Sequence, residues 1–223
     1  MQDQIMPSGK WVFDEGVTNA FDDMLSRSIP QLDIMRGLVT EIANEFITPQ
    51  STVIDLGTSQ GAMLQGLSAR CIGIEISKPM ADKARERLPS VDIREIDLRY
   101  DYPDERAKVA LSILTLQFTP IEYRLSILKR VYENLLDGGV FILVEKVLGS
   151  SAVIDKVLVD RYYDLKRANG YTDEQIERKR LSLEGVLVPV TAKWNEDMLH
   201  LTGFKQVDCF WRWLNFSGWI AIK

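Results

Sequence analysis

The sequence predicts an α/β protein built on a doubly wound parallel β-sheet. Three observations support this fold class: five short apolar stretches alternate with segments of helical periodicity, the first of these stretches runs into a glycine turn, and the C-terminal residues have the pattern of a helix followed by a hairpin. We expect residues 1–223 to form one domain, with N-terminal helices over about 15–48 and a helical insertion over about 150–185.

The N-terminal half alternates between helix and strand patterns. Apolar residues at helical spacing, among them Met35, Val39 and Phe46, predict an amphipathic helix. The segments "TVIDLG" and "CIGIEI" are continuous apolar runs, which are typical of parallel strands covered on both faces. Ser77 is the predicted N-cap of the next helix, and "VDIREIDL" predicts a short third strand.

The next two units repeat this alternation. Residues 108–118, "KVALSILTLQF", predict a fourth strand, and Pro120 starts a helix whose buried stripe runs through Leu128 to Leu135. The tripeptide "DGG" is expected to end that helix, and "VFILVEK" is the fifth strand.

The C-terminal third has a different pattern. Gly170 is a predicted helix stop, and "TDEQ" at residues 172–175 is a capping box that starts another helix. A short helix ends at Gly203, and "KQVDCFWRWLNF" with "SGWIAIK" predicts an antiparallel hairpin. This order of units indicates a class I methyltransferase-type (Rossmann-like) sheet with a terminal antiparallel hairpin and an added helical cap.

The glycine turn predicts the ligand. Its spacing is Asp55, Gly57 and Gly61, and Ser59 stands where the common D-x-G-x-G-x-G pattern has a glycine. Gly57 supplies the tight turn, and Gly61 lets the following helix pack on the strand. Asp55 places a carboxylate beside the loop, which suits a ligand with an ammonium group better than one with a pyrophosphate. S-adenosylmethionine therefore fits this loop better than a dinucleotide does.

Two more carboxylates follow the next strands. Glu75 ends the second strand and can accept hydrogen bonds from both ribose hydroxyls. Asp97 ends the third strand, where a carboxylate can accept from an adenine amino group. Either residue alone is as consistent with a solvated strand end, but together with the loop they favour a nucleoside site.

Composition excludes several classes of protein. The formal net charge of -5 argues against tight binding of a polyanion, so we expect no direct contact with nucleic acid. No run approaches the length of a membrane span, and the N-terminus lacks the pattern of a secretory signal. The two cysteines, Cys71 and Cys209, have no metal-ligand spacing. We expect a cytoplasmic protein with no metal site.

Longer segments resemble one family. The loop "DLGTSQGA" fits a D-L-G-x-S-x-G-A pattern in which serine is the expected residue, and "WVFDEGV", "RSIP", "TLQF" and "LNFSG" also match. The most specific segment is "DLKRANGYTDEQIERKRLSLEGV". Over residues 11–223 the chain resembles the carboxy-S-adenosyl-L-methionine synthase family, whose product is used to make 5-oxyacetyl uridine at the tRNA wobble position.

The resemblance implies an enzyme that converts S-adenosylmethionine and prephenate to carboxy-S-adenosylmethionine and phenylpyruvate. Carbon dioxide released from prephenate is captured at the methyl carbon. The resemblance also implies a homodimer, and it assigns Arg180 as the guanidinium that binds the new carboxylate. The implied nucleoside contacts are Gly57, Thr58, Ser59, Glu75, Ile76, Asp97 and Leu98.

Two implied contacts depart from the family. A tyrosine and an asparagine of the family are Leu32 and Ile113 here, and an uncompensated loss of a hydrogen bond costs about 1–3 kcal/mol. Affinity, substrate or pathway could therefore differ. Two other functions stay open: a methyltransferase acting on a small molecule, which needs no carboxylate clamp, and a protein that binds the nucleoside without turnover.

Overall fold

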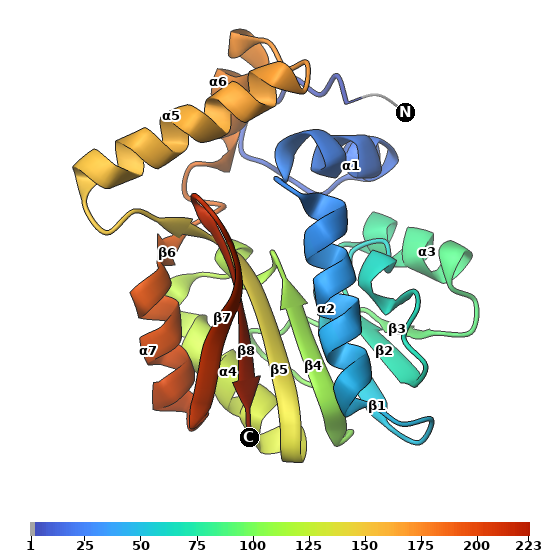
Figure 1. Cartoon of the computed structure of the whole chain (residues 1–223). Coiled ribbons are helices and arrows are strands. Elements are labelled where there is room, and N and C mark those ends of the chain that lie inside the picture. Colours follow the sequence, from blue (N-terminus) through green and yellow to red (C-terminus); the bar gives the residue numbers. More distant parts are fainter. Residues whose placement is uncertain (1–2) are drawn as a thin grey trace.

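The computed structural model describes residues 3–223, which surround one β-sheet (Figure 1). The strand order is β3-β2-β1-β4-β5-β8-β7, and the short β6 pairs with the end of β5. The strands are β1 (Thr52–Leu56), β2 (Arg70–Ile74), β3 (Asp92–Arg94), β4 (Ala107–Ile113), β5 (Leu135–Leu148), β6 (Val190–Thr191), β7 (Gln206–Trp213) and β8 (Phe216–Ile222). Strands β1 to β5 are parallel and the β7–β8 hairpin is antiparallel, which confirms the predicted fold class.

Helices cover both faces of the sheet. The α-helices are α1 (Glu15–Ser28), α2 (Leu32–Phe46), α3 (Lys78–Arg87), α4 (Ile121–Asn134), α5 (Ala152–Ala168), α6 (Asp173–Leu183) and α7 (Ala192–Thr202), with 3-10 helices η1 (Ala62–Leu64) and η2 (Leu116–Phe118). None of these α-helices is both long and apolar enough to cross a membrane.

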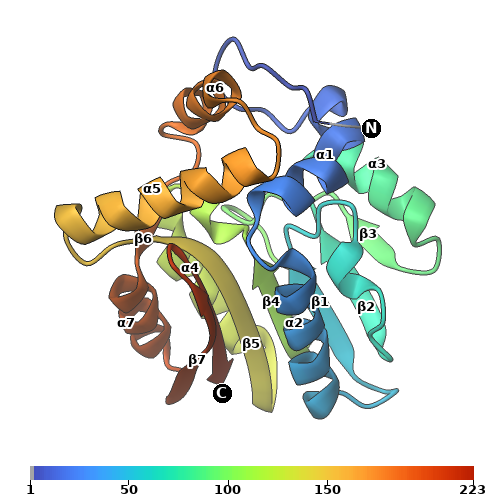
Figure 2. The same cartoon turned by 45° about the horizontal axis from the view of Figure 1, so that its top comes forward.

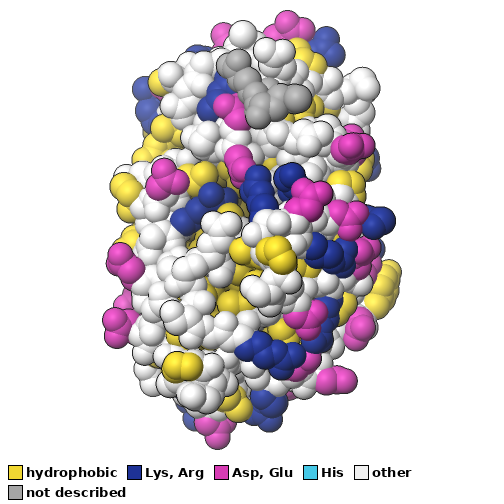
Figure 3. All heavy atoms as spheres, turned by 90° about the vertical axis from the view of Figure 1, so that its right-hand side faces the viewer, with side chains coloured by type: hydrophobic (Ala, Val, Ile, Leu, Met, Phe, Trp, Pro, Cys, Tyr) yellow, Lys and Arg dark blue, Asp and Glu magenta, His cyan; other side chains and the backbone are white. Residues whose placement is uncertain are grey.

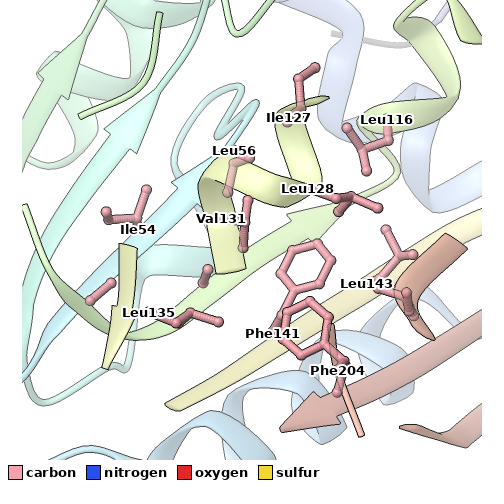
Figure 4. Close-up of a cluster of buried hydrophobic side chains, with 14 of the residues drawn as sticks. Ile54, Leu56, Leu116, Ile127, Leu128, Val131, Leu135, Phe141, Leu143 and Phe204 are labelled. Atoms are coloured by element: carbon pink, nitrogen blue, oxygen red, sulfur yellow. The ribbon is translucent and has the colours of Figure 1, made fainter. Parts of the chain in front are cut away.

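The alternating side chains of β5 divide the core into two layers. Phe141 and Leu143 pack with α4 and α7 on one face, where Phe141 stacks on Phe204 (Figure 4). Ile142 and Val144 pack with α2 on the other face. Because β5 is buried on both faces, its residues 140–144 are apolar without a break.

A group of helices lies over the carboxyl ends of the parallel strands (Figures 1 and 2). We call α1, α5, α6 and the segment before α1 the cap. Helix α6 begins with the predicted capping box, in which the Thr172 and Gln175 side chains bond to each other's backbone N–H. The N-terminal segment is tied to α6, because the Trp11 amide donates to the Ser182 carbonyl at 2.9 Å and Asp3 forms an ion pair with Lys179.

Four predicted boundaries were wrong. The fourth strand ends at Ile113 rather than 118, because Leu114 takes φ +59° and η2 follows. The third strand ends at Arg94, before Asp97. One turn of 3-10 helix follows Gly61 instead of an α-helix. Helix α4 stops at Asn134, and "DGG" lies inside β5, at an irregularity in its pairing with β4 where Gly138 has φ +64°.

Candidate functional site

A cavity of about 480 Å³ lies between the carboxyl ends of the central strands and the cap. Sites for small molecules commonly have volumes of about 300–1,000 Å³. Phe21 of α1, Tyr162 of α5 and Lys179 of α6 contribute to its wall from the cap side. In the space-filling view, hydrophobic side chains are visible in a hollow between lysine, arginine and acidic side chains (Figure 3).

Most of the predicted site residues line this cavity. They come from segments that are far apart in the sequence but meet at one edge of the sheet, as expected for parallel strands. The predicted residues in its wall are Leu32, Asp55, Gly57, Thr58, Ser59, Glu75, Ile76, Asp97, Leu98 and Ile113.

The glycine loop is held tightly against its neighbours. Gly57 has φ +69°, and a Cβ placed on it would lie 2.3 Å from Cγ2 of Thr115. Ser59 also takes a positive φ, +52°, and its amide donates to Oε2 of Glu75 at 2.8 Å. The serine therefore adopts the backbone conformation that the usual glycine would adopt, and the hydrogen bond to Glu75 holds it there.

Glu75 directly follows β2 and connects the loop to the next helix. Its Oε1 accepts from the Ser77 amide and its Oε2 from the Ser59 amide, each at 2.8 Å. The residue is 8% exposed, and burial raises the pKa of its carboxyl. Each carboxylate oxygen has a second lone pair, so Glu75 can still accept hydrogen bonds from a ligand in the cavity.

Asp55 is the most buried carboxylate in the cavity wall, at 2% exposure. Burial, reinforced by the nearby Glu75 charge, raises the pKa of Asp55 to about 7, while Arg36 opposes the shift. A bound ammonium group would favour the ionised form of Asp55. This environment suits an amino-acid moiety better than a pyrophosphate.

Asp97 lies three residues beyond β3, in a loop that still reaches the cavity. The Arg99 guanidinium donates to both of its carboxylate oxygens, at 2.6 Å and 2.9 Å for the two shortest contacts, and holds the pKa of Asp97 below its usual range. The Arg99 backbone amide also donates to Oδ1 at 3.0 Å, so a hydrogen bond from a ligand would share or replace one of the contacts from Arg99.

The two residues that depart from the family pattern, Leu32 and Ile113, both line the cavity with apolar side chains. Leu32 is the first residue of α2, and Ile113 is the last residue of β4. Their positions in the wall mean that the two substitutions change the surface that faces a ligand.

Arg180 and Gly61 lie outside the cavity wall. The Arg180 side chain is 43% exposed, and its Nε and Nη2 both donate to Glu177 of the same helix at 2.8 Å. Arg180 therefore does not line the cavity of its own chain, and the contact with the ligand that the resemblance implies stays a prediction. Gly61 serves packing against the α3 region, since a Cβ there would lie 2.6 Å from Leu88. The 3-10 turn η1 directly follows Gly61, and the helix that packs against this glycine is the next one, α3.

Several cations in the wall have no role predicted from the sequence: Arg36, Lys146, Lys166 and Lys179. Lys166 lies within the specific segment "KRANGY", four residues after Tyr162, and both side chains are buried on one side of α5. Residues four apart lie on the same face of a helix, so the spacing from Tyr162 to Lys166 was the signal in the sequence for an inward-facing lysine.

The strand order, the glycine loop after β1 and the cavity above it define a class I methyltransferase-type fold. An O-methyltransferase family protein from Burkholderia thailandensis has a similar structure, with a TM-score of 0.67 and 16% identity over 94% of this chain and 60% of that chain. Human N-acetylserotonin methyltransferase, solved in complex with SAM, gives a TM-score of 0.62 and 15% identity over 94% and 55%.

Sequence comparison identifies the family. A model described as "Methyltransferase domain" matches residues 54–143. The carboxy-S-adenosyl-L-methionine synthase of Methylococcus capsulatus is 37% identical, covering 95% of this chain and 93% of that protein. The corresponding protein of Staphylococcus epidermidis is 38% identical, covering 96% and 97%. The chain belongs to the carboxy-S-adenosyl-L-methionine synthase family.

Proposed function

We propose that this protein is a carboxy-S-adenosyl-L-methionine synthase that uses S-adenosylmethionine and prephenate. The observation that supports this most is the near full-length similarity to synthases, because it includes the cap as well as the sheet. In this proposal Asp55 binds the ammonium group, Glu75 the ribose hydroxyls and Asp97 the adenine amino group. The loop of Gly57, Thr58 and Ser59 lies against the amino-acid moiety, and Ile76, Leu98, Leu32 and Ile113 supply apolar contacts.

The reaction balances without a protein base. Prephenate loses its ring carboxyl as carbon dioxide and its ring hydroxyl as hydroxide, which leaves phenylpyruvate. The hydroxide takes a proton from the methyl group next to the sulfonium, and the resulting carbon forms a bond to the carbon dioxide. The protein would hold both substrates and exclude water, because bulk water would disperse the carbon dioxide and hydroxide.

The test is incubation of the purified protein with S-adenosylmethionine and prephenate. We expect phenylpyruvate and a nucleoside heavier by one carboxyl group, both identified by mass spectrometry. Accumulation of S-adenosylhomocysteine with a methylated small acceptor would replace this proposal with the methyltransferase function that the matched domain favours. Retention of unchanged nucleoside would instead indicate a binding protein.

We further propose that Arg180 binds the new carboxylate from a second copy of the chain in a homodimer. Its side chain is exposed, and it lies beside the half-exposed Leu181. The neighbouring helix α5 also exposes Val153 and Val157, at 77% and 55%. Exposed apolar side chains on these two helices of the cap favour coverage by another protein surface.

Mixing two impaired variants tests this arrangement. Arg180→Ala and Glu75→Ala should each be strongly impaired at low S-adenosylmethionine concentration. After subunit exchange, half of the dimers carry one intact site, so activity should recover to about a quarter of the wild-type value. If Arg180 acted within its own chain, every site in the mixture would lack one residue, and no recovery would occur.

We also propose the cytoplasm as the compartment. Both cysteines are free, and oxidising compartments favour disulfides.

A further inference from the structure

Lysine side chains and aromatic rings alternate on the cap side of the cavity. The Nζ of Lys146 lies 4.8 Å from the ring centroid of Tyr162, and the Nζ of Lys166 lies 5.7 Å from the same centroid. Lys166 is also 5.0 Å from the ring of Tyr171, which lies 4.7 Å from the Nζ of Lys179. Three ammonium groups from β5, α5 and α6 therefore gather around two rings.

Only part of this positive charge is neutralised by the chain. Asp3 pairs with Lys179, and Asp23 pairs with Arg27, which stacks on Tyr171. Among residues 3–223, no carboxylate lies within 4.0 Å of the Nζ of Lys146 or Lys166, and neither ammonium group makes a hydrogen bond to protein. Both side chains line the cavity, and Lys166 is 7% exposed.

Burial of these ammonium groups without a counter-ion is unfavourable. Burial lowers the pKa of Lys146 to about 8. Burial, with the like charges of Lys179 and Lys146, lowers the pKa of Lys166 to about 7. The nearby rings compensate only in part. Two unpaired cations in the wall of a cavity are the arrangement that an anionic ligand would stabilise.

The sheet register places Lys146 near Ile113, one of the predicted nucleoside contacts. Val144 pairs with Ile113 across β5 and β4, and Lys146 follows two residues later on the same strand. Ile113 lies in the cavity wall beyond the glycine loop of β1. An anion held by Lys146 would therefore lie in the same cavity as the proposed nucleoside site.

We propose that Lys146 and Lys166 form an anion subsite that binds the two carboxylates of a small dicarboxylic co-substrate. The choice of prephenate as that co-substrate rests on the proposed function. The subsite itself rests on the two unpaired ammonium groups. It differs from the role proposed for Arg180, because both lysines face the cavity of their own chain.

Binding measurements with substrate analogues test the subsite apart from turnover. The protein is saturated with S-adenosylhomocysteine, which has no methyl group to transfer, and prephenate is titrated by calorimetry. A second probe is 2-oxoglutarate, because it has the same chain of atoms between its carboxylates as prephenate. The variants are Lys146→Met and Lys166→Met. Lys156→Met is the matched control, since it removes an exposed lysine from α5, the helix that carries Lys166.

We expect each variant to bind both probes at least about tenfold more weakly, as loss of a charge-assisted contact requires. The affinity of each variant for S-adenosylhomocysteine should stay within about twofold of the wild-type value. The affinity of the Lys156→Met control for both probes should also stay within about twofold of the wild-type value. The melting temperature without ligand should stay equal or rise in Lys166→Met, because an unpaired buried charge is removed. A lysine with a purely structural role would show the opposite change.

The pH dependence has a defined sign. An anion favours the charged lysines, so binding should be tightest below about pH 7 and weaken as pH rises through the lowered pKa values, with proton uptake on binding. The variants should lose part of this dependence. The charged group that acts on Lys146 is Asp155. The charged groups that act on Lys166 are Lys179, Lys146, Asp3 and Arg27.

The outcomes separate the subsite from the proposed reaction. Lysine-dependent binding without phenylpyruvate formation would keep the subsite and remove the synthase function. Wild-type turnover in both variants would keep the synthase function and remove the subsite. Binding of prephenate by either variant within threefold of the wild type, or no binding of either probe by the wild type, would overturn the subsite.

Discussion

Replacement of Gly57 by alanine should strongly weaken nucleoside binding. The new Cβ would lie 2.3 Å from Cγ2 and 2.6 Å from Oγ1 of Thr115, and φ +69° is unfavourable for any residue with a Cβ. The backbone term costs about 1–2 kcal/mol and the steric overlap about 1–3 kcal/mol more. The loop must shift to relieve both, so affinity measured by calorimetry should fall by about 30-fold or more.

Gly185 provides a matched control for this change. It has φ +73°, but a Cβ there meets no atom within 4 Å. Gly185→Ala therefore carries the backbone strain without the overlap and should leave nucleoside affinity unchanged. Adding Thr115→Ala to Gly57→Ala removes the two closest contacts and should recover part of the binding. Equal losses of affinity in Gly57→Ala and Gly185→Ala would contradict the steric explanation.

Asp3→Asn should strongly destabilise the folded protein. Asp3 is buried and accepts hydrogen bonds from Lys179 and from the Tyr171 hydroxyl. Removal of its charge leaves the buried Lys179 ammonium unpaired, which costs about 3–5 kcal/mol when a buried pair is broken. For a chain of this size each kcal/mol lowers the melting temperature by about 2–4 °C. A fall of about 10 °C in thermal unfolding is expected.

Two further variants isolate the charge effect. Asp160→Asn breaks an ion pair with Lys156 whose side chains are 46% and 76% exposed, so its effect on unfolding should be within about 1 kcal/mol. The double change Asp3→Asn with Lys179→Met removes both buried charges and should be more stable than Asp3→Asn alone. A double variant no more stable than Asp3→Asn would show that the charge is not the cause.

The part of the site that was predictable from sequence follows from parallel-strand geometry. Apolar runs identified the strands, and the carboxyl ends of parallel strands meet at one edge of the sheet. Asp55 and Glu75 could therefore be placed in one cavity without a structure. Ser59 at the position of a glycine was accounted for by the family's loop pattern, and the structure gives its positive φ and its bond to Glu75.

Other features depend on contacts that leave little trace in the sequence. A leucine with φ +59° at position 114 ends β4, although leucine does not favour that conformation. On α6, Lys179 and Arg180 are adjacent and therefore point in different directions. The spacing of Ile176, Lys179 and Leu183 marks the inward face, but only if one knows that this face meets Trp11 and the cavity.

A chain emerging from the ribosome can complete the cap only after α6 has been made, and the sheet only after β8 has been made. Asp3 and Trp11 cannot form their contacts until α6 has been made. Strand β8 follows β7 in the chain, although it lies between β5 and β7 in the sheet. About 70 residues separate the end of β5 from the end of β8, which takes about 4–14 s at usual rates of synthesis. During that interval one edge of β5, whose side chains are apolar on both faces, has no neighbouring strand. Nascent chains of this protein are therefore expected to depend on chaperones more than their stable final fold would indicate.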